Sequence, residues 1–257
     1  MTTWATRQQK ALVRAYQLDV PGPRKHALFL PGWDTEANTG CLCIEQALKM
    51  GTIDQHTQIT AAERNPEFIT SIQRKLSRFG FSKAPIFHKA ELHNLKLTKK
   101  IDYAMFDLLG TLGNDLVEWL RKSFLPQTVS GTSVAFTFTE FWRNNPFMEC
   151  CEKGWQKPEF HSLVIDTYDR YGINDWNLLL HLLILKSVFN GFSFEYRRAH
   201  RYRDNVQTMC AFRLDNLQRL ANPSWPSLQD VLSQQPRRIV IMPKTLTLVP
   251  TPPRRRG

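Results

Sequence analysis

The segment from His26 to Glu63 constrains the fold of this chain more than any other part of its sequence. An apolar run at residues 26–30 is followed by a loop, and residues 41–50 carry apolar side chains at helical spacing. A second apolar run, at residues 58–62, ends at Glu63. A strand, a helix and a second strand in this order predict one βαβ unit, whose two strands are parallel.

Glu63 directly follows the second strand of this unit, at a position where a side chain can contact a bound cofactor. The loop after the first strand contacts a bound cofactor, and an acidic residue that ends the second strand can accept hydrogen bonds from both ribose hydroxyls. The sequence therefore predicts that Glu63 binds a ribose. Two structural alternatives stay open. Glu63 could cap the helix that begins at Asn65-Pro66, or it could pair with Arg64 and Lys75.

Alternating strands and helices continue along the chain. Further helices are expected at residues 4–18, 65–80, 114–124 and 176–189, and further strands at residues 84–88, 101–106 and 133–139. The strand-like segments 192–199 and 206–214 are joined by a short link, residues 201–205, which predicts an antiparallel hairpin. The expected fold class is α/β, with a Rossmann-like, mostly parallel sheet, helices on both faces and a terminal antiparallel hairpin.

Composition limits the domain organisation and the partners. The 257 residues divide into an N-terminal helix (1–22), a Rossmann-like domain (23–217) and a C-terminal extension (218–257) with a basic Pro/Arg-rich tail. The formal net charge of +11 favours nucleic acid as a partner over a membrane surface, because no helix combines one basic face with a large apolar one. No segment approaches the roughly 20 apolar residues of a membrane span. Five cysteines without a C-x-x-C pair predict reduced thiols, no metal site and a cytoplasmic location.

A basic and aromatic run at residues 196–203 is a candidate nucleic-acid interface. Strand alternation predicts Arg197 and Arg201 on one face, and Arg198 and Tyr202 on the other. Arginines contact phosphates, and tyrosines offer stacking surfaces for unpaired bases. A solvated hairpin tip is the structural alternative. The predicted nucleic-acid-binding residues are Arg197, Arg198, Arg201 and Arg203.

The strand-helix units, the closing hairpin and the carboxylates at strand ends resemble the class I S-adenosylmethionine-dependent methyltransferases over roughly residues 26–214. The resemblance implies S-adenosylmethionine as the cofactor, with Glu63 on the ribose, Glu91 near the adenine amine and Asp107 beside the methyl donor. Asp107 and Glu140 are the candidate catalytic residues, with roles in orienting or deprotonating the methyl acceptor. The implied cofactor-binding residues are Pro31, Gly32, Asp34, Glu36, Glu63, Glu91 and Asp107.

The sequence also departs from the pattern of this family. Its glycine-rich loop is reduced to Gly32 and a distant Gly40. Trp33 and Thr35 could therefore crowd a ligand, since only glycine lets the backbone approach without a Cβ clash. Enzymes that methylate base amines carry an Asp-Pro-Pro-aromatic motif at this position. Asp107 is followed by Leu-Leu-Gly instead, so this motif is absent here.

A narrower resemblance is to methyltransferase-like proteins of phages and plasmids, which share the Leu30-Pro31-Gly32 and Glu63-Arg64-Asn65-Pro66 segments. The predicted function is S-adenosylmethionine-dependent methyl transfer to an unknown acceptor, with nucleic acid as a candidate. The alternative, favoured by the reduced glycine loop, is a catalytically inactive methyltransferase-like module that binds nucleic acid or a protein. Neither the acceptor atom nor the oligomeric state follows from the sequence.

Overall fold

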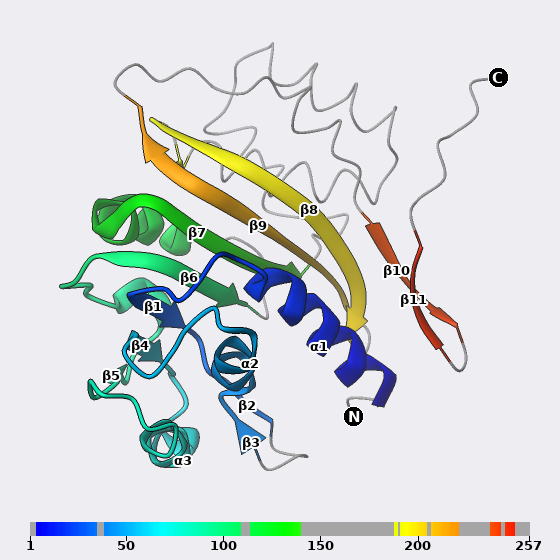
Figure 1. The fold of residues 1–257 in the computed structure, drawn as a ribbon, viewed down its shortest axis with the longest axis horizontal. Coiled ribbons are helices and arrows are strands. Elements are labelled where there is room, and N and C mark those ends of the chain that lie inside the picture. The colour runs from blue at the N-terminus through cyan, green and yellow to red at the C-terminus, as the bar shows by residue number, and fades with distance from the viewer. Residues whose placement is uncertain are drawn as a thin grey trace.

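The structure is a computed structural model that describes residues 4–34, 39–108, 114–139, 188–189, 191–204, 207–220, 237–242 and 245–249. Within these residues, a nine-stranded sheet has the order β11-β10-β8-β9-β7-β6-β1-β4-β5 (Figure 1). Its strands are β1 (His26–Phe29), β4 (Gln58–Ala62), β5 (Ile86–His88), β6 (Ile101–Asp107), β7 (Thr128–Thr139), β8 (Phe192–Asp204), β9 (Gln207–Arg219), β10 (Arg237–Met242) and β11 (Thr245–Val249). The helices are α1 (Trp4–Leu18), α2 (Leu42–Met50), α3 (Pro66–Ser77) and α4 (Asn114–Trp119), with short helical turns η1 (Leu92–Asn94), η2 (Leu120–Phe124) and η3 (Leu125–Gln127). A separate small hairpin consists of β2 (Trp33–Asp34) and β3 (Thr39–Gly40).

The central strands are parallel, and the strand order reverses beside β1. β1 pairs with β4 on one side and with β6 on the other, so that Leu28 lies between Thr60 and Ala104. β5 and β7 continue the sheet in parallel on the two sides. In sheets of this kind, ligands bind outside the carboxyl ends of the strands, at the point where the order reverses. The arrangement confirms the predicted α/β fold and places its functional edge at the ends of β1, β4 and β6.

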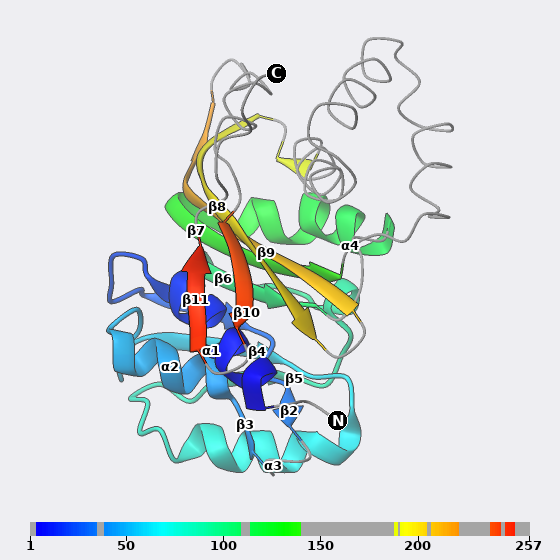
Figure 2. The same cartoon turned by 90° about the vertical axis from the view of Figure 1, so that its right-hand side faces the viewer.

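β8 and β9 form the predicted antiparallel hairpin, but their strands are longer than predicted. β9 lies between β7 and β8 and is antiparallel to both. The two strands stay paired up to Asp204 and Gln207, so Arg201 and Arg203 belong to β8. The predicted link at residues 201–205 is therefore wrong, because backbone pairing with β9 continues through residues 201–204. β10 and β11 extend the sheet beyond β8 (Figure 2), and β11 contacts α1.

The described helices form where the apolar periodicity predicts them. α1 has the predicted bounds, and α2, α3 and α4 lie within the predicted segments. At the start of α3, the Asn65 side chain accepts a hydrogen bond from the Glu67 amide (3.0 Å), which satisfies one otherwise unpaired N–H group. The helix predicted at residues 176–189 lies outside the described residues except for positions 188–189. Among the described helices, none has the length and apolar character needed to cross a membrane.

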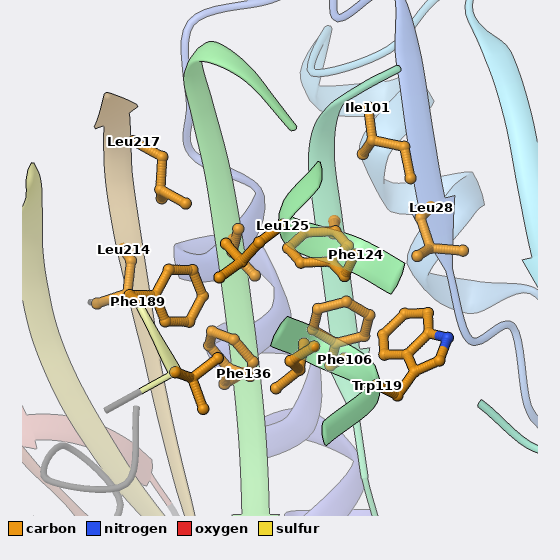
Figure 3. Close-up of a cluster of buried hydrophobic side chains, with 14 of the residues drawn as sticks. Leu28, Ile101, Phe106, Trp119, Phe124, Leu125, Phe136, Phe189, Leu214 and Leu217 are labelled. Atoms are coloured by element: carbon orange, nitrogen blue, oxygen red, sulfur yellow. The ribbon is translucent and has the colours of Figure 1, made fainter. Parts of the chain in front are cut away.

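Two apolar clusters hold the helices against opposite faces of the sheet. On one face, the rings of Phe106, Trp119 and Phe124 meet between β6 and α4 (Figure 3). The centroids of Phe106 and Phe124 are 5.2 Å apart, in an edge-to-face geometry that aromatic rings prefer. On the other face, α2 and α3 pack on β1, β4 and β6 through a cluster that includes Phe29 and Ile44. Removal of these side chains from water stabilises both layers.

The C-terminal half of α1 is fixed to the sheet by buried polar contacts. The Gln17 side chain donates hydrogen bonds to the carbonyl oxygen of Phe136 (2.9 Å) and to Thr137 Oγ1 (3.0 Å). Arg213 Nη1 donates to the carbonyl oxygen of Tyr16 (2.6 Å). These contacts set the register of α1 along β7 and β9, because a displaced helix would leave buried polar atoms without partners.

Candidate functional site

A cavity of about 460 Å³ opens where the strand order reverses. Its volume lies in the range of small-molecule sites, about 300–1,000 Å³. Leu116 of α4 closes one side of it. The other walls come from the carboxyl ends of four strands, with Gly32 after β1, Ala62 and Glu63 at β4, Glu91 and Leu92 after β5, and Asp107 and Leu108 at β6. The fold thus brings Gly32, Glu63, Glu91 and Asp107, all predicted cofactor-binding residues, to one place.

The other predicted site residues do not line this cavity in the described part of the structure. Pro31 is buried, and its carbonyl oxygen accepts a hydrogen bond from the Cys41 amide (3.0 Å). Asp34 belongs to β2, and its side chain lies outside the described part. Glu36 and the candidate catalytic residue Glu140 also lie outside the described residues. The described cavity is therefore built mainly from strand ends.

Glu63 ends β4 and is half-buried in the wall of the cavity. Its carboxylate Oε1 accepts a hydrogen bond from the Asn65 amide (2.8 Å), at the entry to α3. The alternative ion pair with Lys75 does not form, because Lys75 Nζ pairs with Glu45 (2.9 Å). One contact therefore orients the Glu63 carboxylate, and its remaining acceptor sites face no other described partner.

Glu91 lies between β5 and η1, on another wall of the cavity. Its Oε1 is 3.4 Å from Arg64 Nη1, and its Oε2 is 3.4 Å from His93 Nε2, a pair that requires a protonated His93. The Arg64 and Glu91 side chains are 74% and 46% exposed, so solvent screens their attraction. The contact nevertheless links the end of β4 with the loop after β5. Neither Arg64 nor His93 was a predicted site residue. The position of Arg64 directly after Glu63 is the sequence feature that could have indicated Arg64.

Asp107 ends β6 with its side chain exposed at the cavity. Its backbone is in register with Thr137 of β7, and the Leu108 amide donates a hydrogen bond to the Thr137 carbonyl oxygen (3.1 Å). The Asp107 carboxylate makes no hydrogen bond or ion pair with another described residue. It is therefore available to a ligand or substrate.

Cys41 and Cys43 lie at the start of α2, and both are buried. Burial raises the pKa of each thiol to about 12. Both thiols therefore stay protonated at neutral pH, which makes them poor nucleophiles and poor metal ligands. Within the described ranges, no cluster of three or more His, Cys, Asp or Glu side chains could hold a metal ion.

The loop after β1 folds as a small hairpin that the sequence does not predict. β2 and β3 pair Trp33 with Gly40. A Cβ at Gly40 would lie 2.6 Å from the Gly32 carbonyl oxygen, so glycine is needed for the hairpin to close. The Trp33 ring stacks on Phe68 of α3, with ring centroids 6.4 Å apart. Trp33 therefore does not crowd the cavity, and Thr35 lies outside the described residues.

The basic run of β8 is partly engaged within the protein. Arg197 Nη2 pairs with Glu195 (2.7 Å), and Arg197 Nε pairs with Asp215 (3.0 Å). A β-bulge after Arg197 shifts the alternation, so Arg197 and Tyr202 share a face and the predicted split between faces is wrong. Tyr202 is buried against Val13 of α1 and offers no stacking surface. The other predicted interface side chains lie outside the described part of the structure, namely Arg198, Arg201 and Arg203.

Comparison with known proteins identifies the fold. Neither a protein-family model nor a curated protein sequence matches this chain. The N-methyltransferase NodS from Bradyrhizobium japonicum WM9 matches in structure with a TM-score of 0.50 at 10% identity, over 82% of this chain and 96% of that chain. The chain has the class I methyltransferase fold.

Two further structures of lower similarity are NodS in complex with S-adenosyl-L-homocysteine and the 23S rRNA methyltransferase ErmE. NodS in the complex has a TM-score of 0.48 at 10% identity, over 83% of this chain and 88% of that chain. ErmE has a TM-score of 0.47 at 14% identity, over 86% of this chain and 71% of that chain. At such identities the likeness concerns the class I methyltransferase fold alone, because one fold supports many substrates.

Proposed function

We propose that the protein is an S-adenosylmethionine-dependent methyltransferase. The observation that carries this proposal is a cavity at the reversal point of the sheet, lined by carboxylates from three strand ends. S-adenosylmethionine has a ribose, an adenine ring and a zwitterionic amino-acid end. The ribose hydroxyls, the adenine amine and the ammonium of the amino-acid end are hydrogen-bond donors, from which carboxylates can accept. The three carboxylates are Glu63, Glu91 and Asp107.

The Glu63 carboxylate fits the ribose. An ionised carboxylate offers about four lone-pair sites, and the Asn65 amide occupies one of them. The remaining sites are sufficient for two hydroxyl groups. The hydrogen bond from Asn65 also orients Glu63 before a ligand arrives, which reduces the entropy lost on binding.

The wall that carries Glu91 fits the adenine ring. Ala62, Leu92 and Leu116 contribute apolar surface to the cavity, against which a flat base can pack. The Glu91 carboxylate can accept a hydrogen bond from the exocyclic amine of adenine. Arg64, which also lines the cavity, lies 3.4 Å from the Glu91 carboxylate.

Methyl transfer requires a methyl donor and a correctly oriented methyl acceptor. Bound S-adenosylmethionine would supply an activated methyl group: a nucleophile of the substrate would attack the methyl carbon in line, the carbon–sulfur bond would break, and S-adenosylhomocysteine would leave as a neutral thioether. Asp107 has an exposed carboxylate at the cavity and could orient the acceptor or take its proton. Glu140 is proposed for the same role, because it directly follows β7 in the sequence.

Replacing Glu63 with alanine is expected to weaken binding of S-adenosylhomocysteine by about 1–3 kcal/mol, which is about 5- to 150-fold in Kd. The substitution removes the acceptors for two hydroxyl groups that become desolvated in the cavity. Isothermal titration calorimetry with the purified protein measures the change. Glu63→Gln retains one acceptor oxygen and is expected to bind with intermediate affinity.

Glu67→Ala is the matched control, because Glu67 is exposed at the start of α3 and does not line the cavity. It removes the same charge nearby and should leave the Kd unchanged. A folded Glu63→Ala protein that binds as tightly as the parent would exclude Glu63 from the site. A parent protein that binds neither S-adenosylmethionine nor S-adenosylhomocysteine at millimolar concentration would overturn the proposed function and favour the inactive module.

For the methyl acceptor, we propose nucleic acid. The formal net charge of +11 and the arginine-rich strand β8 support an anionic substrate. Arg197 is already paired with two carboxylates. Phosphate contacts would therefore depend on its neighbours in the run, which are Arg198, Arg201 and Arg203.

Binding to DNA or RNA is expected to weaken with salt, with a log-log slope of about −0.7 to −0.9 for each phosphate contact. Fluorescence anisotropy with single- and double-stranded DNA and RNA measures this slope. Replacing Arg198, Arg201 and Arg203 together with alanine should flatten the slope, whereas Arg197→Ala should leave it unchanged. Deletion of residues 252–257 tests the basic tail. If this deletion abolishes binding while the triple variant behaves like the parent, β8 does not contact nucleic acid.

A further inference from the structure

A group of lysines surrounds the amino ends of the parallel strands, at the edge of the sheet opposite the cavity (in Figure 1, the end of β6 without the arrowhead). Lys100 directly precedes β6, and Lys25 directly precedes β1. Lys99 lies one residue further from β6, and Lys83 lies three residues before β5. All four residues are exposed. We call them the lysine patch.

Gln58, the first residue of β4, connects the segments that carry the lysine patch. Its amide donates a hydrogen bond to the Lys25 carbonyl oxygen (2.9 Å), and its Oε1 accepts one from Lys99 Nζ (3.4 Å). Its Nε2 donates to the carbonyl oxygen of the residue that follows Lys83 (3.0 Å). Lys100 directly follows Lys99 in the chain. The four lysines therefore gather around one residue of a buried strand, which fixes their backbones relative to one another.

Carboxylates do not neutralise the lysine patch within the described part of the protein. Lys99 and Lys100 donate hydrogen bonds to neutral oxygens, over 3.4 and 2.7 Å. The Lys25 and Lys83 side chains contact no described carboxylate. Asp102, at the start of β6, uses its two carboxylate oxygens to accept hydrogen bonds from backbone amides (2.8 and 2.9 Å). The like charges of the lysine patch repel one another, and an anionic partner would relieve this repulsion.

We propose that the lysine patch binds the phosphate backbone of the nucleic acid that the protein methylates. This inference rests on the proposed nucleic-acid acceptor, and it adds a contact surface at the edge of the sheet opposite the site of methyl transfer. Lysine is depleted in interfaces between proteins, whereas lysine side chains are common phosphate contacts in nucleic-acid complexes. A patch of exposed lysines therefore favours nucleic acid over an acidic protein.

The position of the lysine patch sets a lower limit on the length of the acceptor. β6 has 7 residues, and a strand rises about 3.3 Å per residue, so the patch lies about 23 Å from the edge that carries the cavity. Nucleotides of a duplex follow one another at about 3.4 Å along each strand. An acceptor that reaches both edges therefore contains at least about seven nucleotides, which excludes a free nucleotide as the substrate.

Replacing Lys25 and Lys83 together with glutamine is expected to weaken binding of an oligonucleotide of about 20 nucleotides by about 25- to 60-fold near 0.1 M salt. Each lost phosphate contact reduces the log-log salt slope by about 0.7–0.9, which is about 5- to 8-fold in affinity between 1 M and 0.1 M salt. Fluorescence anisotropy with single- and double-stranded DNA and RNA measures the affinity and the slope. Lys25→Arg with Lys83→Arg keeps both charges and should bind like the parent.

Arg74→Gln with Lys122→Gln is the matched control. It also removes two exposed positive charges, one from α3 and one from η2, which cover opposite faces of the sheet. This control should bind nucleic acid like the parent. All these variants should bind S-adenosylhomocysteine like the parent, because none of the substituted residues lines the cavity. Thermal unfolding verifies that each variant is folded.

The outcomes separate this inference from the proposed function. A glutamine variant with the affinity and salt slope of the parent would exclude the lysine patch from the interface. Equal losses in the glutamine variant and in the control would show an effect of total charge. An arginine variant that binds as weakly as the glutamine variant would show that positive charge is not what the patch supplies. Each of these three results overturns the inference and leaves the nucleic-acid acceptor standing. A parent that binds no nucleic acid at low salt overturns both, while binding of S-adenosylhomocysteine still decides whether the protein is a methyltransferase.

Discussion

Replacing Asp215 with alanine is expected to lower the free energy of unfolding by about 3–5 kcal/mol. Asp215 is 5% exposed and accepts hydrogen bonds from Arg213 Nε (2.8 Å) and Arg213 Nη2 (2.9 Å). Arg213 is 6% exposed, so alanine would leave a buried guanidinium without a carboxylate among the described residues that contact it, next to carbonyl groups of α1 and the Tyr16 ring. Urea denaturation followed by circular dichroism measures the loss.

Glu195→Ala is the matched control for this prediction. Glu195 pairs with Arg197, which also contacts Asp215, but the Arg197 and Glu195 side chains are 49% and 52% exposed. Its removal should therefore cost less than about 1 kcal/mol. Arg213→Met should cost less than Asp215→Ala, because Asp215 keeps Arg197 as a partner. If Asp215→Ala costs no more than Glu195→Ala, the buried pair does not fasten α1 to the sheet.

Replacing Phe136 with alanine is expected to lower the free energy of unfolding by about 3–5 kcal/mol. Phe136 is 1% exposed on β7, and the centroid of its ring lies 5.4 Å from that of Phe106 and 5.6 Å from that of Phe212. Phe189 approaches edge-on, with the centroids 6.2 Å apart (Figure 3). Alanine would leave a cavity among rings that belong to different strands and cannot all move to fill it.

Val129→Ala is the control on the same strand, because Val129 is 37% exposed. Its cost should stay below about 1 kcal/mol, since little apolar surface is lost from the core. The comparison uses the same denaturation assay. Equal costs for Phe136→Ala and Val129→Ala would show that the aromatic cluster adapts to the missing ring.

Local sequence patterns were sufficient for the order of the strands and helices from α1 to β9, apart from the small hairpin β2–β3, and they named four of the residues that line the cavity. Apolar periodicity located β1, β4, β6 and α1, because each of these elements buries a face whose spacing is set by its own backbone geometry. Glu63 and Asp107 directly follow two of the predicted strands. The carboxyl ends of parallel strands share one edge of a sheet, so these residues could be placed together without any knowledge of their contacts.

Long-range packing was needed to establish what the remaining charged and aromatic residues contact. Tyr202 has the pattern of an exposed stacking residue, but a β-bulge and the packing of α1 bury it. Arg197 has the pattern of a phosphate ligand, but Asp215 on the next strand pairs with it. The burial of a side chain and the neutralisation of its charge depend on residues that are distant in the sequence. Local periodicity does not indicate which residues these are.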